Sequence, residues 1–381
     1  MSTFITIVLV ILILGVLIFI HELGHFLAAR LVNASVLEFS LGFGPKIISK
    51  EYKGTVYSIR LLPLGGFVNI LGDGDPGKVD KEQLKKVKQG GNLKDKSRLA
   101  QIFVMLAGIL MNIFLAIACY FVVLGFSGWR IELSYEFVDF DPIGAEIVKE
   151  RESDVPYEVV EGSLADQSYM PDTGYIKEIN GQRVEYSEDI SGLIEGNDLV
   201  DILACSEDNT CDVYKVEVGD DEKIGIAIGV NYLVYIDYSN SKVFAGFSHL
   251  INDVRLIGRI LNTLLKEAKE TGDYTTLSQS VSGPVGMFFL VDYFKDLGWI
   301  PLVSLIADLS LSLAIMNVLP IPALDGGRVL IIAIESVLRK DLDPKVEAII
   351  INTSFIILIV FVVFIMIKDI ITINELKSLF E

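Results

Sequence analysis

Charged residues are scarce in this chain of 381 residues. Only 22% of the sequence is Asp, Glu, Lys or Arg, whereas 51% is hydrophobic, and the mean hydropathy is +0.51. This composition is too apolar for an ordinary soluble enzyme, and the length allows two or three structural units. The sequence therefore indicates a membrane protein.

No Lys or Arg occurs before Arg30, although the run from Phe4 to Ile20 is apolar throughout. A secretory signal peptide has a basic start and a small-residue cleavage site, whereas here the helical pattern continues through Ala28 and Ala29. The run is near the length that a membrane-spanning helix requires. We therefore expect a permanent first span with its N-terminus outside.

The charges that are present are unevenly distributed. Residues 30–99 carry 13 Lys and Arg against 7 Asp and Glu, whereas residues 127–299 carry 13 against 33. An excess of Lys and Arg in a short loop near a span marks the cytoplasmic side. The basic residues just before the second apolar run are Lys78, Lys81, Lys85, Lys86, Lys88, Lys94, Lys96 and Arg98. We expect this loop inside, and the acidic balance elsewhere argues against nucleic acid as a partner.

The hydropathy pattern predicts about four transmembrane helices. They fall in residues 1–33, 100–127, 300–338 and 346–368, and a tail over 369–381 follows outside. The other segments are predicted to be a membrane-associated β segment with the basic loop over 34–99, a linker over 128–154, a small mixed α/β domain over 155–232, and amphipathic helices over 243–299. Because spans alternate in direction, the α/β domain is expected on the external side.

The sequence His21-Glu22-Leu23-Gly24-His25 is the first candidate for chemistry. On a helix, residues four apart share a face, so the two imidazoles point the same way, and two of the chain's three histidines are used here. Two neutral imidazoles and a third ligand suit Zn²⁺ with one position left for water, and Glu22 is placed to accept the proton of that water.

The alternative is that these residues are the polar interfacial end of a span. The apolar pattern resumes after the motif, from Phe26 to Ala29, so the cluster lies inside the helix. There each uncompensated charge costs about 2.5–3.5 kcal/mol, and a metal ion would supply the compensation.

A third ligand is expected at a similar depth on another span. Asp325 lies in the Pro- and Gly-rich segment Asn317 to Gly327, within an otherwise apolar region. The alternative role for Asp325 is to cap a helix that restarts after the prolines. His249 is the competing third ligand, but it falls on the external amphipathic helix and by this topology lies on the wrong side.

With these residues in view, the chain resembles the site-2 protease family of intramembrane zinc metalloproteases, in its bacterial RseP type. The resemblance covers most of the chain. It is carried by the zinc-site sequence together with Phe39 to Pro45, Pro63 to Val68, Ala107 to Asn112, Ser282 to Gly286, and Asn317 to Gly327. The fold it implies is a polytopic α-helical membrane protein with a membrane-associated β segment after the first span and one extracytoplasmic PDZ-like domain between the second and third.

The resemblance also implies a function. It implies one Zn²⁺ per chain, completed by Asp325, and it implies that Asn112 and Asn317 lie near the active site and hold substrate backbone. The implied substrates are single-span membrane proteins, such as anti-sigma factors, or remnant signal peptides, in a bacterial inner membrane. The chain departs from the family in having Ile109 where Pro is usual and in having room for only one PDZ domain.

Three cysteines are present. Cys205 and Cys211 flank a five-residue segment in the external domain, where they can form a disulfide that closes a hairpin, or remain two free thiols. Cys119 falls in the second span and is expected to be a small core residue.

Two other functions remain open from the sequence. One is a membrane-anchored zinc protease with a soluble catalytic domain, whose third ligand is a Glu on a later helix. The other is a non-catalytic membrane scaffold with a peptide-binding PDZ-like domain. The soluble catalytic domain is disfavoured because the helix that carries Glu22 is continuous with the first span. The scaffold is disfavoured because a structural metal site would not need Glu22 as a base.

Overall fold

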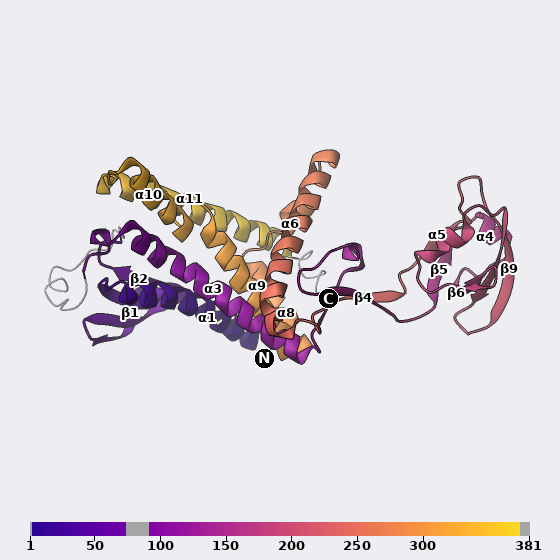
Figure 1. Ribbon diagram of the computed structural model, residues 1–381, viewed down its shortest axis with the longest axis horizontal. Coiled ribbons are helices and arrows are strands. Elements are labelled where there is room, and N and C mark those ends of the chain that lie inside the picture. The colour runs from indigo at the N-terminus through magenta and orange to yellow at the C-terminus, as the bar shows by residue number, and fades with distance from the viewer. Residues whose placement is uncertain (1, 74–90, 374–381) are drawn as a thin grey trace. The chain divides into compact units, whose positions relative to one another are not determined.

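The computed structural model describes residues 2–73 and 91–373, which fall into two compact units (Figure 1). Unit 1 contains Met1–Phe126 and Gly246–Glu381, and unit 2 contains Ser127–Ala245. Part of the predicted basic loop, including Lys78, Lys81, Lys85, Lys86 and Lys88, lies outside the described residues, as does the end of the predicted tail.

Within its described residues, unit 1 has four helices long and apolar enough to cross a membrane. They are α1 (Ser2–Leu31), α3 (Arg98–Phe126), α9 (Trp299–Val318) and α11 (Pro344–Ile371). The further helices are α6 (Ala245–Thr271), α7 (Thr275–Gln279), α8 (Pro284–Leu297) and α10 (Asp325–Leu338). The region predicted as the third span, 300–338, has the Pro-rich break that its sequence predicts: Pro320 and Pro322 separate α9 from α10.

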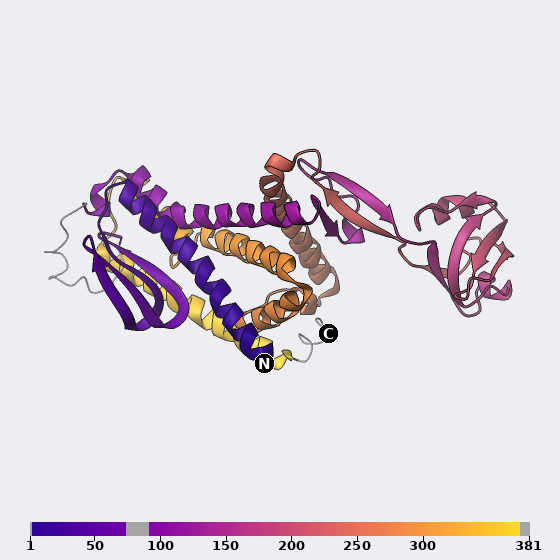
Figure 2. The same ribbon diagram turned by 90° about the horizontal axis from the view of Figure 1, so that it is seen from below.

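The helix α3 lies at the centre of unit 1. It packs against α1, α9 and α10, and in Figure 2 it approaches α1 most closely where α1 ends and α3 begins. Small residues allow this approach, since a Cβ added to Gly24 would lie 2.3 Å from the carbonyl oxygen of Ala107. The polar sequence near the end of α1 is therefore pressed directly against the α3 backbone.

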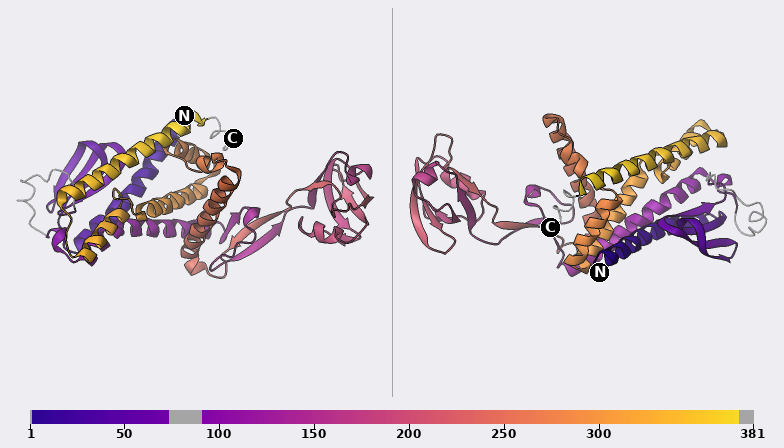
Figure 3. Two further views of the ribbon diagram at one scale, coloured as in Figure 1. Left: turned by 90° about the horizontal axis from the view of Figure 1, so that it is seen from above. Right: turned by 180° about the vertical axis from the view of Figure 1, so that it is seen from behind.

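Two long strands, β1 (Val36–Tyr52) and β2 (Thr55–Ile70), follow α1 and pack beside it (Figure 3). Both strands bend, β1 near Gly42 with φ +86° and β2 near Gly65 with φ +148°. The bends allow the first half of β1 to pair with two parts of β2, so that Phe39 is opposite both Tyr57 and Val68. Residues 66–70 of β2 therefore form an edge, with β1 as their only strand partner among the described residues.

A buried carboxylate fixes this sheet internally. Glu38 accepts hydrogen bonds from Ser58 at 2.7 Å, Arg60 at 2.8 Å and Lys46 at 3.0 Å. Charged acceptors of this kind make stronger hydrogen bonds than neutral ones, so the bent strands are held in one register.

The end of α11 is attached to the start of α8. The fully buried Asp369 accepts the backbone N–H groups of Gly283 at 2.8 Å and Gly286 at 3.1 Å, within the sequence Ser282 to Gly286. A carboxylate here satisfies N–H groups that a helix N-terminus leaves without partners. Asp369 belongs to α11, which continues to Ile371, beyond the predicted end of the span at residue 368.

Unit 2 contains two antiparallel sheets. The larger has the strand order β10-β5-β6-β8-β9, with β7 paired to β6. Its elements are β5 (Val155–Val159), α4 (Leu164–Gln167), β6 (Thr173–Ile179), β7 (Gln182–Arg183), α5 (Asp189–Ile194), β8 (Leu199–Cys205), β9 (Cys211–Glu217) and β10 (Ile226–Ile228). Aliphatic side chains including Ile176, Ile202 and Val216 are completely buried in its core.

The smaller sheet differs from the sequence prediction. Residues 128–154 were predicted to be a linker, but they contain β3 (Arg130–Leu133) and β4 (Glu146–Arg151), which pair on either side of β11 (Tyr232–Asp237). β3 and β4 are short, and β11, with which both of them pair, lies far away in sequence. The sequence near each strand therefore does not indicate which other strand it pairs with.

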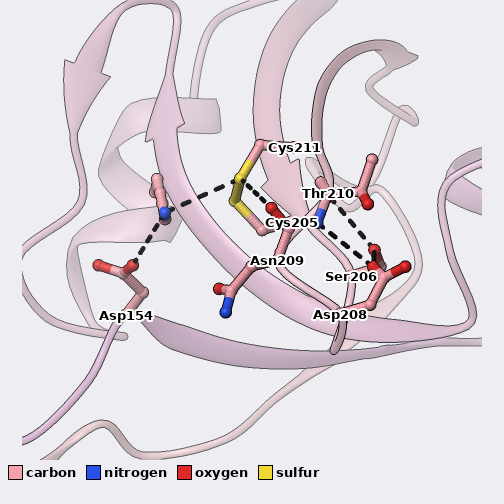
Figure 4. Close-up of a disulfide and its surroundings, with 8 residues drawn as sticks. Asp154, Cys205, Ser206, Asp208, Asn209, Thr210 and Cys211 are labelled. Carbon is pink, nitrogen blue, oxygen red and sulfur yellow. Dashed lines mark hydrogen bonds and ion pairs between the residues drawn. A yellow bond between two sulfur atoms is a disulfide. The ribbon is translucent and has the colours of Figure 1, made fainter.

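Cys205 and Cys211 form a disulfide at the ends of β8 and β9, where the two residues are also paired in the sheet (Figure 4). The loop between them is tightened by the Ser206 backbone N–H, which donates to the Thr210 carbonyl oxygen at 3.0 Å. Cross-linking so short a loop is worth about 2 kcal/mol in the chain-entropy account.

Candidate active site

The helix α1 presents His21 and His25 from neighbouring turns of one face. Both side chains are about one-tenth exposed, and their rings meet edge to face with centroids 4.9 Å apart. His25 Nδ1 lies 2.8 Å from the Val104 carbonyl oxygen of α3. A carbonyl only accepts, so Nδ1 carries the proton and the lone pair of neutral His25 is on Nε2.

A tight turn between α9 and α10 brings Asp325 to the same place. Prolines end α9, and two glycines let the chain fold back: a Cβ on Gly326 would lie 2.2 Å from the Val318 carbonyl oxygen, and one on Gly327 would lie 2.0 Å from that of Ile321. Asp325 is then the first residue of α10, and α10 packs on α3. The Pro- and Gly-rich sequence thus sets the position of the carboxylate.

Three ligand atoms converge here. His21 Nε2 lies 3.1 Å and His25 Nε2 lies 3.2 Å from Asp325 Oδ2, and the two Nε2 atoms are 3.3 Å apart. These three residues are the one group of three or more His, Cys, Asp or Glu in the described part of the chain whose ligand atoms are close enough to share a metal ion.

The triangle fits Zn²⁺. Bonds of about 2.0–2.1 Å at tetrahedral angles place neighbouring ligands about 3.3 Å apart, and this is close to all three observed separations. Asp325 Oδ2 is buried and has no well-formed hydrogen bond to any residue that the structure describes, and the Nε2 lone pair of His25 faces it. Two electron-rich acceptors facing one another are stable when a cation lies between them.

The α3 backbone leaves room for both imidazoles at Gly108. A Cβ on this residue would lie 2.4 Å from His25 Nε2 and 2.9 Å from His21 Nε2. Val104, Gly108 and Asn112 are four residues apart and share one face of α3. On that face, Val104 offers a carbonyl acceptor to the histidines, Gly108 leaves space for their rings, and Asn112 offers a side-chain amide.

A cavity of about 170 Å³ opens onto the site. Its lining residues come from α1, β2, α3, α10 and the turn after β2: His21, Glu22, His25, Phe67, Val68, Ile70, Asp73, Met105, Asp325 and Arg328. Glu22 therefore shares the cavity with all three ligand atoms, and the open β2 edge forms one wall. These residues can together hold a metal ion, accept a proton and bind an extended peptide next to the metal ion and the proton acceptor.

An ion pair crosses the cavity. Arg328, one helical turn after Asp325, lies 2.8 Å from Asp73 in the turn after β2, and both side chains are at most one-fifth exposed. The pair ties the β2 end to the helix that carries Asp325.

Breaking this pair from one side should be more harmful than removing it. Arg328→Met removes the guanidinium beside Asp73 and is expected to lower stability by about 3 kcal/mol or more. The double change Asp73→Asn with Arg328→Met should recover part of that loss. Thermal unfolding of the purified variants measures both, and strictly additive losses would contradict the pairing.

The structure separates the remaining predicted residues. Asn112 is fully buried, with its side-chain nitrogen 3.2 Å from His21 Nδ1. Asn317 donates its side-chain N–H to the Leu313 carbonyl oxygen of its own helix at 2.9 Å and does not line the cavity. His249 packs its ring on Tyr120, with centroids 4.7 Å apart, and does not join the metal-binding group.

Sequence reasoning missed several residues of this site. Gly108 was noticed only as part of a resemblance, and Asp73, Met105 and Arg328 were not singled out. A weak signal existed for Arg328, because a lone cation in an apolar helix usually has a partner. The others are recognisable only once β2, α3 and α10 are placed together.

Comparisons with known proteins find a matching family model and several relatives. The family model described as Peptidase family M50 matches residues 9–361. A putative zinc metalloprotease of Fusobacterium nucleatum is 31% identical over 379 residues, covering 96% of this chain and 98% of the relative. Regulator of sigma-W protease RasP of Bacillus subtilis is 28% identical, with 98% and 99% covered, and Probable protease eep of Enterococcus faecalis is 26% identical, with 92% and 95% covered.

Proposed function

The chain belongs to peptidase family M50 and is a zinc metalloprotease of the site-2 protease type; from this premise we propose that it cuts single-span membrane proteins within or close to the bilayer. His21, His25 and Asp325 hold the zinc ion, and Glu22 is the general base. The observation that carries the proposal is the 3.1–3.3 Å triangle of ligand atoms, which joins one apolar helix to the turn after another.

When bound, zinc polarises a peptide carbonyl and lowers the pKa of a water molecule to near 7. Each residue of the site has a part in using that chemistry. The Nδ1 contact with Val104 aims the His25 lone pair at the metal position. The Glu22 carboxylate, in the same cavity, accepts a proton from the attacking water and returns it to the amine that leaves.

The substrate must be extended before it is cut, because a helix hides its peptide carbonyls in hydrogen bonds. Residues 66–70 of β2 form a sheet edge with Phe67, Val68 and Ile70 in the cavity wall. Addition of a substrate strand to this edge satisfies the backbone groups of both chains. We therefore place the substrate backbone along β2, facing Glu22.

The substrate class follows from where the site is built. α1 continues unbroken through His21 and His25, and it is apolar on both sides of them, so the catalytic groups lie within a span. Substrates that reach this depth are apolar segments, such as those of anti-sigma factors or remnant signal peptides. The sheet of β5 to β10 in unit 2 is proposed to be a PDZ-like extracytoplasmic domain, in a multi-pass protein of the bacterial inner membrane with its active site towards the cytoplasm.

The test is cleavage of a single-span model protein by the purified protein in detergent. Cleavage is expected to stop with 1,10-phenanthroline and to return with added zinc, and product masses should place the cut in or next to the apolar segment. Cleavage that ignores the chelator, or cuts confined to polar regions, would contradict the proposal. Binding without any cleavage would favour the scaffold function.

A further inference from the structure

Both histidines of the site have a second contact through Nδ1, and both contacts come from the same face of α3. His25 Nδ1 donates to the Val104 carbonyl oxygen at 2.8 Å, and His21 Nδ1 lies 3.2 Å from the side-chain amide of Asn112. In histidines that bind metal, the partner of the second ring nitrogen decides which nitrogen keeps the lone pair. The role of Val104 is fixed because a carbonyl can only accept.

Asn112 differs because its amide has both a donor and an acceptor end. The nitrogen end faces His21 Nδ1 at 3.2 Å, while Asn112 Oδ1 is buried and has no hydrogen-bond partner in the described part of the chain. The two ends are nearly equal in size, so a half turn of the amide exchanges them, and the protonation of the imidazole decides which end faces it. A protonated Nδ1 requires the oxygen end.

We propose that Asn112 is a positioning residue that holds His21 in the tautomer with its proton on Nδ1, so that the Nε2 lone pair points at the metal position. The inference rests on the proposed function, and it assigns to Asn112 a role other than holding substrate. With the amide turned by a half turn, Asn112 Oδ1 faces the ring and accepts the Nδ1 proton of His21, as the Val104 oxygen does for His25. One face of α3 thereby sets both tautomers.

The surroundings of Asn112 support this role. The residue is completely buried and does not line the cavity, so its amide is out of reach of a substrate backbone. Its backbone carbonyl oxygen accepts a hydrogen bond from the Ser310 hydroxyl of α9 at 2.9 Å. Packing between α3 and α9 therefore holds the amide beside the imidazole.

The test measures zinc affinity by competition with a chromophoric chelator in wild type, Asn112→Leu and Asn112→Asp. Leu fills a similar volume without an acceptor, and affinity is expected to fall about 10- to 100-fold. Asp offers only acceptor oxygens to the Nδ1 proton, so its affinity should equal or exceed that of wild type. Asn317→Leu is the matched control, since this amide bonds its own helix, and its affinity should change less than about 3-fold.

A second readout separates a positioning role from general damage. Cobalt-loaded wild type and Asn112→Asp should share one visible spectrum, whereas Asn112→Leu should differ in band position or intensity. Wild-type affinity in Asn112→Leu, or equal losses in Leu and Asp, would overturn the proposal. A substrate-holding role would instead raise KM in both variants at unchanged zinc affinity. Wild type that binds no zinc would contradict the proposed function itself.

Discussion

Changing Glu22 to Gln is expected to abolish proteolysis while the protein keeps its zinc. Gln has the shape of Glu but cannot accept a proton, so only the base is lost. Proton transfer by a positioned base contributes about 100- to 10,000-fold to such reactions, and a loss of that size is expected in kcat. Zinc content should stay near one per chain, because Glu22 contributes no atom to the triangle formed by His21, His25 and Asp325.

The measurement is single-turnover cleavage of a single-span substrate, with the metal content of each sample determined in parallel. Glu51→Gln is the matched control, since this is the same change at an exposed position on β1, and its rate should equal that of wild type. Cleavage by Glu22→Gln within about 3-fold of wild type would remove Glu22 from the mechanism. Loss of zinc together with activity would make it a structural residue instead.

Changing Gly108 to Ala is expected to eliminate zinc binding, although the substitution adds only one methyl group. That methyl would lie 2.4 Å from His25 Nε2 and 2.9 Å from His21 Nε2, inside van der Waals contact with both ligands. The imidazoles must move by a distance that removes tetrahedral geometry, and displacements of about 1 Å typically cost 100-fold or more at such sites. Ala is the better helix former, so α3 itself should not weaken.

Gly125→Ala is the control for Gly108→Ala. Gly125 lies on the same helix, and a Cβ there meets nothing within 4 Å. Zinc affinity and cleavage should be unchanged in this variant, while helix content measured by circular dichroism should match wild type in both. Zinc affinity in Gly108→Ala within about 3-fold of wild type would show that the histidines do not hold the metal in the described geometry.

Features that depend on neighbouring residues in the sequence could be predicted from it. The four apolar helices follow from hydropathy, because a membrane span is defined by its own composition. The pairing of His21 and His25 follows from helical spacing alone. Asp325 was predicted to lie near the histidines because the first and third spans were expected to run in the same direction. In the structure, Asp325 Oδ2 lies 3.1 Å from His21 Nε2.

Other features depend on segments far apart in sequence and had no such signal. The space at Gly108 has meaning only because α1 crosses α3 there, and the Asp73–Arg328 pair joins a turn to a helix about 250 residues later. Because β1 and β2 bend, the first half of β1 pairs with two parts of β2, and the alternation of polar and apolar residues does not predict this double pairing. The role proposed for Asn112 likewise needed the position of the His21 ring.

The central claim is that zinc is held by residues from two distant helices, and zinc content of purified Asp325→Ala against wild type tests it most directly. We predict close to one zinc per chain in wild type and almost none in Asp325→Ala after dialysis, because two imidazoles alone leave the site without its carboxylate. Equal zinc in both proteins, or none in wild type, would contradict the account.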